Sequence, residues 1–303
     1  MGPTAAGKTR LTLAMHSSLP VEVISVDAAQ VYRGLDIGTA KPNLAERKRV
    51  PHQLIDICDP AETYSAADFC ADALTAMQQA TAAGRIPLLV GGTMFYFRAL
   101  EYGLPDLPGA DPEVRAELLE EAEQRGWTAM HDKLADSDPE RAARIHRNDP
   151  QRILRALEII ALTGRAASAY GARGTRRLSY NIVKLALFPE DRAWLHARIA
   201  ERFRLMLAEG FMDEARELFA RPDLTPDLPA LRTVGYRQAG LYLSGKINYD
   251  RFIEQALAAT RQLAKRQYTW MRADTELQRL DCSAPHLDIE AAARKMLLTR
   301  LGI

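Results

Sequence analysis

The feature that most constrains this chain is a phosphate-binding loop at its start. Residues 2–9 read Gly-Pro-Thr-Ala-Ala-Gly-Lys-Thr, a complete G-x-x-x-x-G-K-[ST] motif. The glycines let successive backbone N–H groups turn toward phosphate oxygens, Lys8 adds a positive charge, and Thr9 offers a hydroxyl to Mg²⁺. The motif therefore predicts that a phosphate group binds to Gly2, Pro3, Thr4, Ala5, Ala6, Gly7, Lys8 and Thr9.

The segment behind the loop, KTRLTLAMHSS, has the spacing of a short helix, and a helix N-terminus attracts anions. Only Met1 precedes Gly2, so the strand that normally leads into such a loop is missing from the sequence. Either the chain is truncated or the loop is unusually close to the terminus.

Strand and helix patterns alternate after the loop. Val21–Val26 predicts a strand that ends at Asp27, residues 85–93 predict a second strand that ends in a Gly-Gly turn, and residues 180–188 predict a third. A helix is expected between the first two, with Ser65 as its N-cap. This alternation indicates an α/β fold with a parallel sheet, whose ligands bind beyond the carboxyl ends of the strands.

The middle of the chain is helix-rich and divided by charge. Residues 111–140 carry ten acidic and three basic side chains, whereas residues 141–178 carry nine arginines against Asp149 and Glu158. We expect an inserted helical subdomain over residues 111–178. The core would then comprise residues 1–110 and continue over residues 179–303, which read as one strand followed by helices.

Composition excludes several classes of protein. A chain of 303 residues with 47% hydrophobic and 26% charged residues is typical of a globular protein and not of a disordered or coiled-coil one. No apolar run approaches the roughly 20 residues that a membrane span needs, and no signal segment is evident. The three cysteines are too few for a disulfide framework. We expect a cytoplasmic protein without a membrane partner.

Several residues could carry chemistry, and their patterns leave alternatives open. Asp27, at a strand end, could be a magnesium ligand, a general base or a helix cap. Thr93 could approach a phosphate or only complete a tight turn. Arg198 and Arg202 lie four residues apart and could grip a pyrophosphate or form a solvated face. The arginine-rich segments could bind nucleic acid or be solvated.

The combination of segments resembles the bacterial tRNA dimethylallyltransferases, also called tRNA isopentenyl transferases. The resemblance runs from Gly2 to Arg272, and no zinc-finger extension follows it. The matching segments are GPTAAGKT, SVDAAQVYRGLDIGTAKPN, PHQLIDICDP, YSAADF, IPLLVGGTMFYF, NDPQRILRALEI, LRTVGYRQ and TRQLAKRQYTWMR.

The resemblance implies a fold and a reaction. The fold would be a P-loop NTPase-like parallel sheet flanked by helices, with the helical insertion clamping the anticodon stem. The reaction moves the dimethylallyl group of dimethylallyl pyrophosphate onto N6 of adenosine 37 of tRNA with Mg²⁺. Although the loop motif is typical of nucleotide and ATP binding, it would hold the isoprenoid pyrophosphate together with Arg202. Thr9 would reach the magnesium ion, and Asp27 would be the general base.

The same resemblance implies a set of tRNA contacts and a monomeric enzyme. The implied contact residues are Asp27, Ala28, Ala29, Gln30, Thr93, Arg115, Gln151, Arg152, Ile153, Leu154, Arg155, Arg232, Thr233, Val234, Gly235, Tyr236 and Arg237. The residues leave two rival functions, a metabolite kinase that uses ATP and an RNA-binding module without activity. Incubation with dimethylallyl pyrophosphate or with ATP, each with and without tRNA, would distinguish prenyl transfer from these two functions.

Overall fold

The structure of the chain, a computed structural model, describes residues 1–171, 174 and 178–301. It divides into two compact units, unit 1 with Met1–Leu100 and Tyr180–Ile303, and unit 2 with Glu101–Ser179. Unit 2 includes the expected insertion, residues 111–178, and extends it back to Glu101. Three arginines of the expected basic block, Arg173, Arg176 and Arg177, lie outside the described residues.

Unit 1 contains a parallel sheet in the order β2 (His52–Gln53), β1 (Val21–Val26) and β3 (Ile86–Gly91). Every residue of β1 is buried, as expected for a central strand with neighbours on both edges. The strands predicted at residues 21–26 and 85–93 are therefore confirmed, and the mixed α/β class with them. The carboxyl ends of β1 and β3 lie at the same edge, because Val26 pairs with Gly91.

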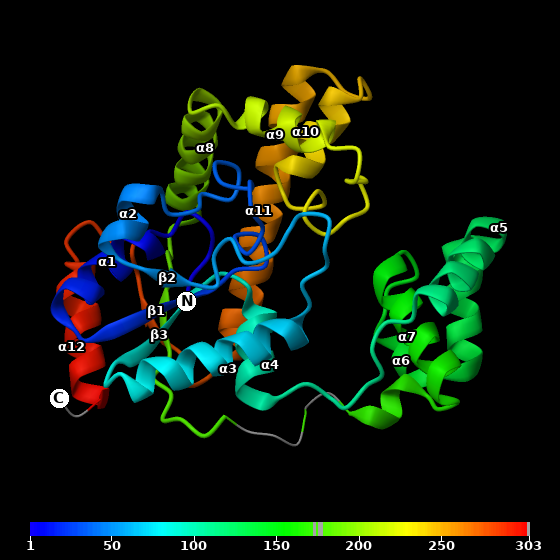
Figure 1. Cartoon of the computed structure of the whole chain (residues 1–303), viewed down its shortest axis with the longest axis horizontal. Helices are drawn as coiled ribbons and strands as arrows, with labels where there is room; N and C mark the ends of the chain where they lie inside the picture. The colour runs from blue at the N-terminus through cyan, green and yellow to red at the C-terminus, as the bar shows by residue number, and fades with distance from the viewer. Residues whose placement is uncertain (172–173, 175–177, 302–303) are drawn as a thin grey trace. The chain divides into compact units, whose positions relative to one another are not determined.

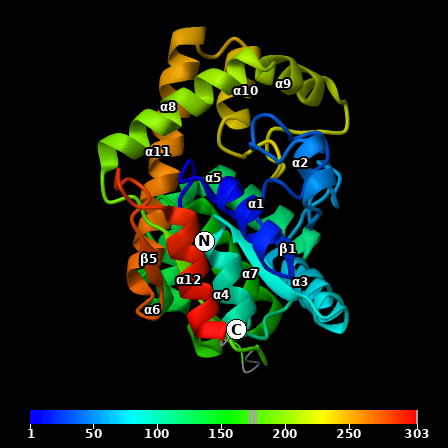
Figure 2. The same ribbon diagram turned by 90° about the vertical axis from the view of Figure 1, so that its left-hand side faces the viewer.

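Helices pack against this sheet. The helix α1 (Lys8–Ser18) contacts β1 and β3, as does α3 (Ala66–Ala82), and α12 (Ile289–Leu301) lies alongside α1 (Figure 2). The predicted N-cap of α3 is confirmed, since the Ser65 hydroxyl oxygen accepts hydrogen bonds from the backbone N–H groups of Ala67 and Asp68. Two further helices of this part are α2 (Leu44–Arg49) and α4 (Met94–Tyr102).

The expected third strand is shorter and lies in a different sheet. Only part of residues 180–188 forms β4 (Leu185–Leu187), which pairs in parallel with β5 (Gln278–Leu280). The expectation of one sheet was therefore wrong for this strand. The physical reason is that both edges of β4 are occupied. Met1 bonds to the Leu185 carbonyl and the Leu187 N–H on one edge, and β5 pairs along the other.

The remaining helices of unit 1 surround an aromatic core. They are α8 (Arg192–Ala208), α9 (Phe211–Ala220), α10 (Tyr236–Leu243) and α11 (Tyr249–Ala273), as Figure 1 shows. The ring of Phe211 lies 5.1 Å from that of Tyr236 and 6.5 Å from that of Phe252, measured between centroids. Apolar residues of α8 and α11, among them Ile199, Phe203, Phe252 and Ala256, belong to the core.

A single carboxylate joins this helical part to a loop that follows β1. Glu214 of α9 accepts hydrogen bonds from the backbone N–H groups of Asp36, Ile37 and Gly38 at 2.7–3.0 Å. It also accepts one from the Tyr236 hydroxyl. Gly38 is required here because a Cβ atom would come within 2.4 Å of the Phe211 ring. The loop is therefore fixed to α9 and α10.

Unit 2 is helical, with α5 (Pro112–Ser137), α6 (Pro139–Ala143), α7 (Pro150–Thr163) and a short 3₁₀ turn over Ala167–Tyr170. Gly126 interrupts α5 with a φ of 79°. A compact apolar core, which includes Met130, Leu134 and Ile153, holds the helices together. Across both units, no helix among the described residues is long and apolar enough to cross a bilayer.

Candidate active site

The glycine-rich loop leads directly into α1. Gly7 caps this helix in the left-handed region, with a φ of 96°, which explains why glycine occupies the position. Lys8 and Thr9 form the first turn of α1, so the helix N-terminus and both side chains lie at the loop. The residues after Gly7 thus form a helix, as expected, and its N-terminus lies at the loop.

Lys8 folds back over this loop. Its half-buried ammonium donates hydrogen bonds to the carbonyl oxygens of Gly2 and Pro3, at 3.0 and 2.9 Å. Burial lowers the pKa of Lys8 to about 8, Asp27 opposes this shift and Arg202 reinforces it. An anion at the loop would stabilise the protonated form.

Asp27 follows the last residue of β1 and faces the same region. Its Oδ1 atom accepts hydrogen bonds from the backbone N–H groups of Ala29 and Gln30, at 2.9 and 3.3 Å. Within the described part of the chain, Oδ2 accepts no hydrogen bond. One oxygen thus fixes the turn, as a cap would, and the other is available to accept a proton.

Thr93 lies beside this turn, between β3 and α4. Its hydroxyl oxygen accepts a hydrogen bond from the backbone N–H of Ala28 at 3.0 Å, and its own N–H donates to Val26. Gly91 permits this close approach, because a Cβ atom there would lie 1.9 Å from the Val26 carbonyl oxygen. Thr93 therefore supports the segment that carries Asp27.

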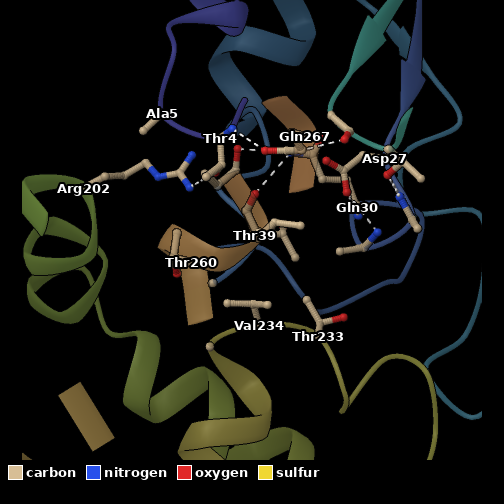
Figure 3. A pocket seen from close by; sticks show the side chains of 18 of the residues that line it. Thr4, Ala5, Asp27, Gln30, Thr39, Arg202, Thr233, Val234, Thr260 and Gln267 are labelled. Atoms are coloured by element: carbon tan, nitrogen blue, oxygen red, sulfur yellow. Dashed lines mark hydrogen bonds between the residues drawn. The ribbon is translucent and has the colours of Figure 1, made fainter. Parts of the chain in front are cut away.

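Gln267 of α11 connects the loop to the Gly-Gly turn. Its side-chain oxygen accepts from the Thr4 N–H at 2.9 Å, and its side-chain nitrogen donates to the Gly92 carbonyl at 2.8 Å. The side chain is buried, and its bond to Gly92 forms away from water, whereas the bond from Thr4 is partly buried. Figure 3 shows this amide and its hydrogen bonds at the centre of the site.

Two arginines of α8 reach the loop from the other side. Arg202 donates to the Thr4 hydroxyl (Figure 3). Arg198 donates to the Ala5 carbonyl at 2.9 Å. Burial lowers the pKa of the Arg202 guanidinium, although Asp27 opposes the shift. The loop therefore lies against three cations, Lys8, Arg198 and Arg202, which favours a multiply charged anion.

These groups share a cavity of about 940 Å³ in unit 1. Its polar part contains Lys8, Thr9, Asp27 and Arg202, and its apolar part is formed by α8 and α11. The apolar lining includes Ile199, Phe203, Leu205, Met206 and Leu263. A ligand with an anionic end and a short hydrocarbon end would match both parts.

Known proteins are similar to this chain in sequence and in fold. The family model described as IPP transferase matches residues 30–274. A curated tRNA dimethylallyltransferase from Nitrosococcus oceani is 56% identical over 282 residues, which cover 93% of this chain and 90% of that protein. The chain belongs to the IPP transferase family.

Solved structures of the family superpose on the whole chain. A tRNA isopentenylpyrophosphate transferase from Bacillus halodurans has a TM-score of 0.72 and 38% identity, covering 99% of this chain and 95% of that one. A eukaryotic dimethylallyltransferase described as acting on tRNA has a TM-score of 0.77 and 26% identity. The match covers 98% of this chain and 77% of that one. The family fold thus extends over both units of the chain.

Most of the unit 1 residues that the family resemblance implies as tRNA contacts line the cavity, and two do not. The cavity is lined by Asp27, Ala28, Ala29, Gln30, Thr93, Arg232, Thr233, Val234 and Gly235. Arg237 is exposed but outside the lining. Tyr236 is fully buried and its hydroxyl is bonded to Glu214, so the structure gives it a packing role.

The implied contacts of unit 2 are Arg115 on α5 and Gln151, Arg152, Ile153, Leu154 and Arg155 on α7. Gln151 and Arg152 are exposed, whereas Ile153 is buried in the core of the unit. Arg115 and Arg155 both pair with the fully buried carboxylate of Glu158, at 2.8 and 2.6 Å. Arg155 also donates to the carbonyl of Pro108 at 2.6 Å. Its guanidinium is thus partly committed within the unit.

Sequence reasoning assigned no role to Gln267, although the signal was present. It lies on the apolar face of α11, in line with Ala256, Leu263 and Met271. A buried glutamine in such a stripe needs partners for its amide, which is a reason to expect a structural or functional contact. Of the exposed aromatic residues of the cavity, Phe95 was missed, and Trp270 was noted only as part of a basic segment with aromatic residues.

Proposed function

We propose that the chain transfers the dimethylallyl group of dimethylallyl pyrophosphate to N6 of adenosine 37 in tRNA, with release of pyrophosphate. One observation carries the proposal: Lys8, Arg202 and the free oxygen of Asp27 share one cavity with an apolar wall. Membership of the IPP transferase family supports the same reaction class.

The core would be P-loop NTPase-like, and the donor would bind with its pyrophosphate on the loop of residues 2–9. Backbone N–H groups of the loop, the α1 N-terminus, Lys8 and Arg202 supply donors and positive charge. The dimethylallyl group would lie against Ile199, Phe203 and Met206. Because charge develops on the leaving pyrophosphate, these fixed donors stabilise the transition state more than the ground state.

The residues present fit a magnesium ion. Mg²⁺ prefers oxygen ligands, retains several waters and is held largely by substrate phosphates. In the described chain no group of three His, Cys, Asp or Glu side chains could hold a metal by itself. Thr9, whose side chain lines the cavity beside Lys8, would hold the ion together with the pyrophosphate. When bound, it would neutralise charge on the leaving group.

Asp27 would act as the general base. The adenine N6 lone pair forms the new bond to the allylic carbon as the carbon–oxygen bond to pyrophosphate breaks, and the leaving group retains that electron pair. The N6 proton passes to Oδ2 of Asp27, while Oδ1 remains bonded to Ala29 and Gln30. The adenine must leave the base stack to reach this carboxylate. We propose the exposed Gln151 and Arg152 of unit 2 as contacts to the anticodon stem.

A donor competition tests the function. The protein is incubated with labelled dimethylallyl pyrophosphate or γ-labelled ATP, each with and without tRNA. Label on tRNA from the prenyl donor alone would support the proposal. Turnover of ATP without label on tRNA would favour a kinase, and tRNA binding without transfer from either donor would favour a binding module.

A further inference from the structure

Two exposed aromatic side chains lie together in the wall of the cavity. Phe95 is 49% exposed and Trp270 is 38% exposed, and both line the cavity. Their ring centroids are 6.5 Å apart, and the ring planes make an angle of 64°. Large apolar side chains that gather on a concave surface mark a binding site.

Neither ring is needed to build the core. Phe95 lies in the first turn of α4, where its neighbours Met94 and Tyr96 are the buried residues. Trp270 lies one turn after Gln267 on α11. Phe95 is thus on α4 and Trp270 on α11, and the hydrogen bond from Gln267 to Gly92 links α11 to the turn before α4. Phe95 is two residues from Thr93.

Positive charge accompanies these rings. The guanidinium carbon of Arg98 lies 5.6 Å from the centroid of the Trp270 ring, and the exposed Arg266 also lines the cavity. Throughout the described residues, no carboxylate lies within ion-pair distance of either arginine. Uncompensated cations beside exposed aromatic faces are the chemistry with which proteins bind unpaired RNA bases and their phosphates.

We propose that Phe95 and Trp270 form a stacking platform for an unpaired nucleobase next to the reacting adenosine, and that Arg98 and Arg266 contact its adjoining phosphates. The proposal rests on the proposed function, because it specifies how the same cavity holds its RNA. The platform adjoins the Thr93 turn, which supports the segment of Asp27. A base stacked there would help to keep the adenine out of the loop stack.

The test replaces each ring with an aliphatic side chain, which keeps an apolar surface but provides no aromatic face. In Phe95→Leu and Trp270→Leu, the Kd and KM for an anticodon stem-loop RNA should rise roughly 5- to 150-fold per ring, the range found for base–aromatic stacking. The KM for dimethylallyl pyrophosphate should stay within about twofold. Trp270→Phe should recover most of the RNA affinity, since it restores an aromatic face.

Tyr249→Leu is the matched control. Tyr249 begins the same helix, is 43% exposed and lies outside the cavity lining, so its replacement should leave RNA affinity unchanged. A second readout uses 2-aminopurine in place of the base beside the adenosine. Its fluorescence should be quenched by the wild-type protein and by Tyr249→Leu, but not by Trp270→Leu.

The outcomes separate this proposal from the proposed function. If the wild type transfers label to RNA and both leucine variants bind RNA as tightly as it does, the platform is wrong and the function stands. If the wild type transfers no prenyl label, the proposed function fails. If Trp270→Leu instead changes the sedimentation of the free protein with RNA affinity intact, the surface belongs to a second copy, which also overturns the platform.

Discussion

The side-chain oxygen of Gln267 accepts a hydrogen bond from the backbone N–H of Thr4 at 2.9 Å, across 263 positions of the chain. The same amide donates to Gly92, so α11 sets the distance between the phosphate loop and the β3–α4 turn. The Thr4 hydroxyl is bonded to Arg202 of α8. Thr4 is therefore fixed through its backbone by one helix and through its side chain by another.

Replacing this amide should impair donor binding. Gln267→Leu leaves the Thr4 N–H unpaired, at a cost of about 1–3 kcal/mol, and removes one of the two hydrogen bonds to the Gly92 carbonyl, which still accepts from the Met94 N–H. We expect the KM for dimethylallyl pyrophosphate to rise about tenfold and the unfolding temperature to fall. Gln262→Leu, on the exposed face of the same helix, is the control. A destabilised Gln267→Leu with an unchanged KM would limit this residue to a structural role.

Asp27→Asn should separate chemistry from local structure. The asparagine oxygen can still accept from Ala29 and Gln30, so the turn persists, but the amide cannot take the N6 proton. We expect single-turnover transfer to slow by about 10²–10⁴-fold while tRNA binding is retained. Transfer at the wild-type rate would exclude Asp27 as the base.

The lowered pKa of Lys8, about 8, predicts a pH dependence of donor capture. Lys8 is a cation below this value and neutral above it, so kcat/KM for dimethylallyl pyrophosphate should fall as pH rises through about 8. The bound pyrophosphate raises the pKa, so kcat should decline only at higher pH. In Lys8→Arg, the fall of kcat/KM should shift to higher pH, because an arginine stays charged. A fall that remains at about pH 8 in this variant would have to arise from another group.

Glu158 should dominate the stability of unit 2. Glu158→Gln removes the charge that pairs with Arg115 and Arg155, and we expect a loss of about 3 kcal/mol, measured by urea unfolding. The two guanidiniums lower the pKa of Glu158 against the effect of burial, so its contribution is present above the unfolded pKa of a glutamate and is lost as pH falls. The exposed Glu140, paired with Arg144, offers a control in Glu140→Gln, expected to change stability by less than about 1 kcal/mol.

The parts of the fold that local chemistry dictates were predictable. The loop over residues 2–9, the cap at Ser65 and the strand before Asp27 each depend on residues close together in sequence. The pairing of β4 with β5 was not predictable, because the partners are more than 90 residues apart and each strand has three residues. Nothing in either segment specifies the other.

The site was predictable to a similar extent. Motif and strand ends brought Lys8, Thr9, Asp27 and Thr93 together, and the cavity contains all four. The orientation of Arg202 depended on how α8 packs, and Gln267 and Glu158 carried a weaker signal, a polar residue on an apolar helix face. Their partners depend on the packing of elements that are distant in sequence, which the helical period does not encode.

The attachment of the 36–38 loop to Glu214 has a mechanical consequence. Thr39 and Ala40 form part of the cavity wall, and the Gln30 side chain donates to their carbonyls. This part of the wall is therefore bonded to the segment after β1 on one side and, through residues 36–38, to α9 on the other. A displacement of α9 would pull directly on the segment behind Asp27. Substitutions in the aromatic core, remote from any substrate, should therefore change the rate at which Asp27 accepts the N6 proton in the proposed reaction.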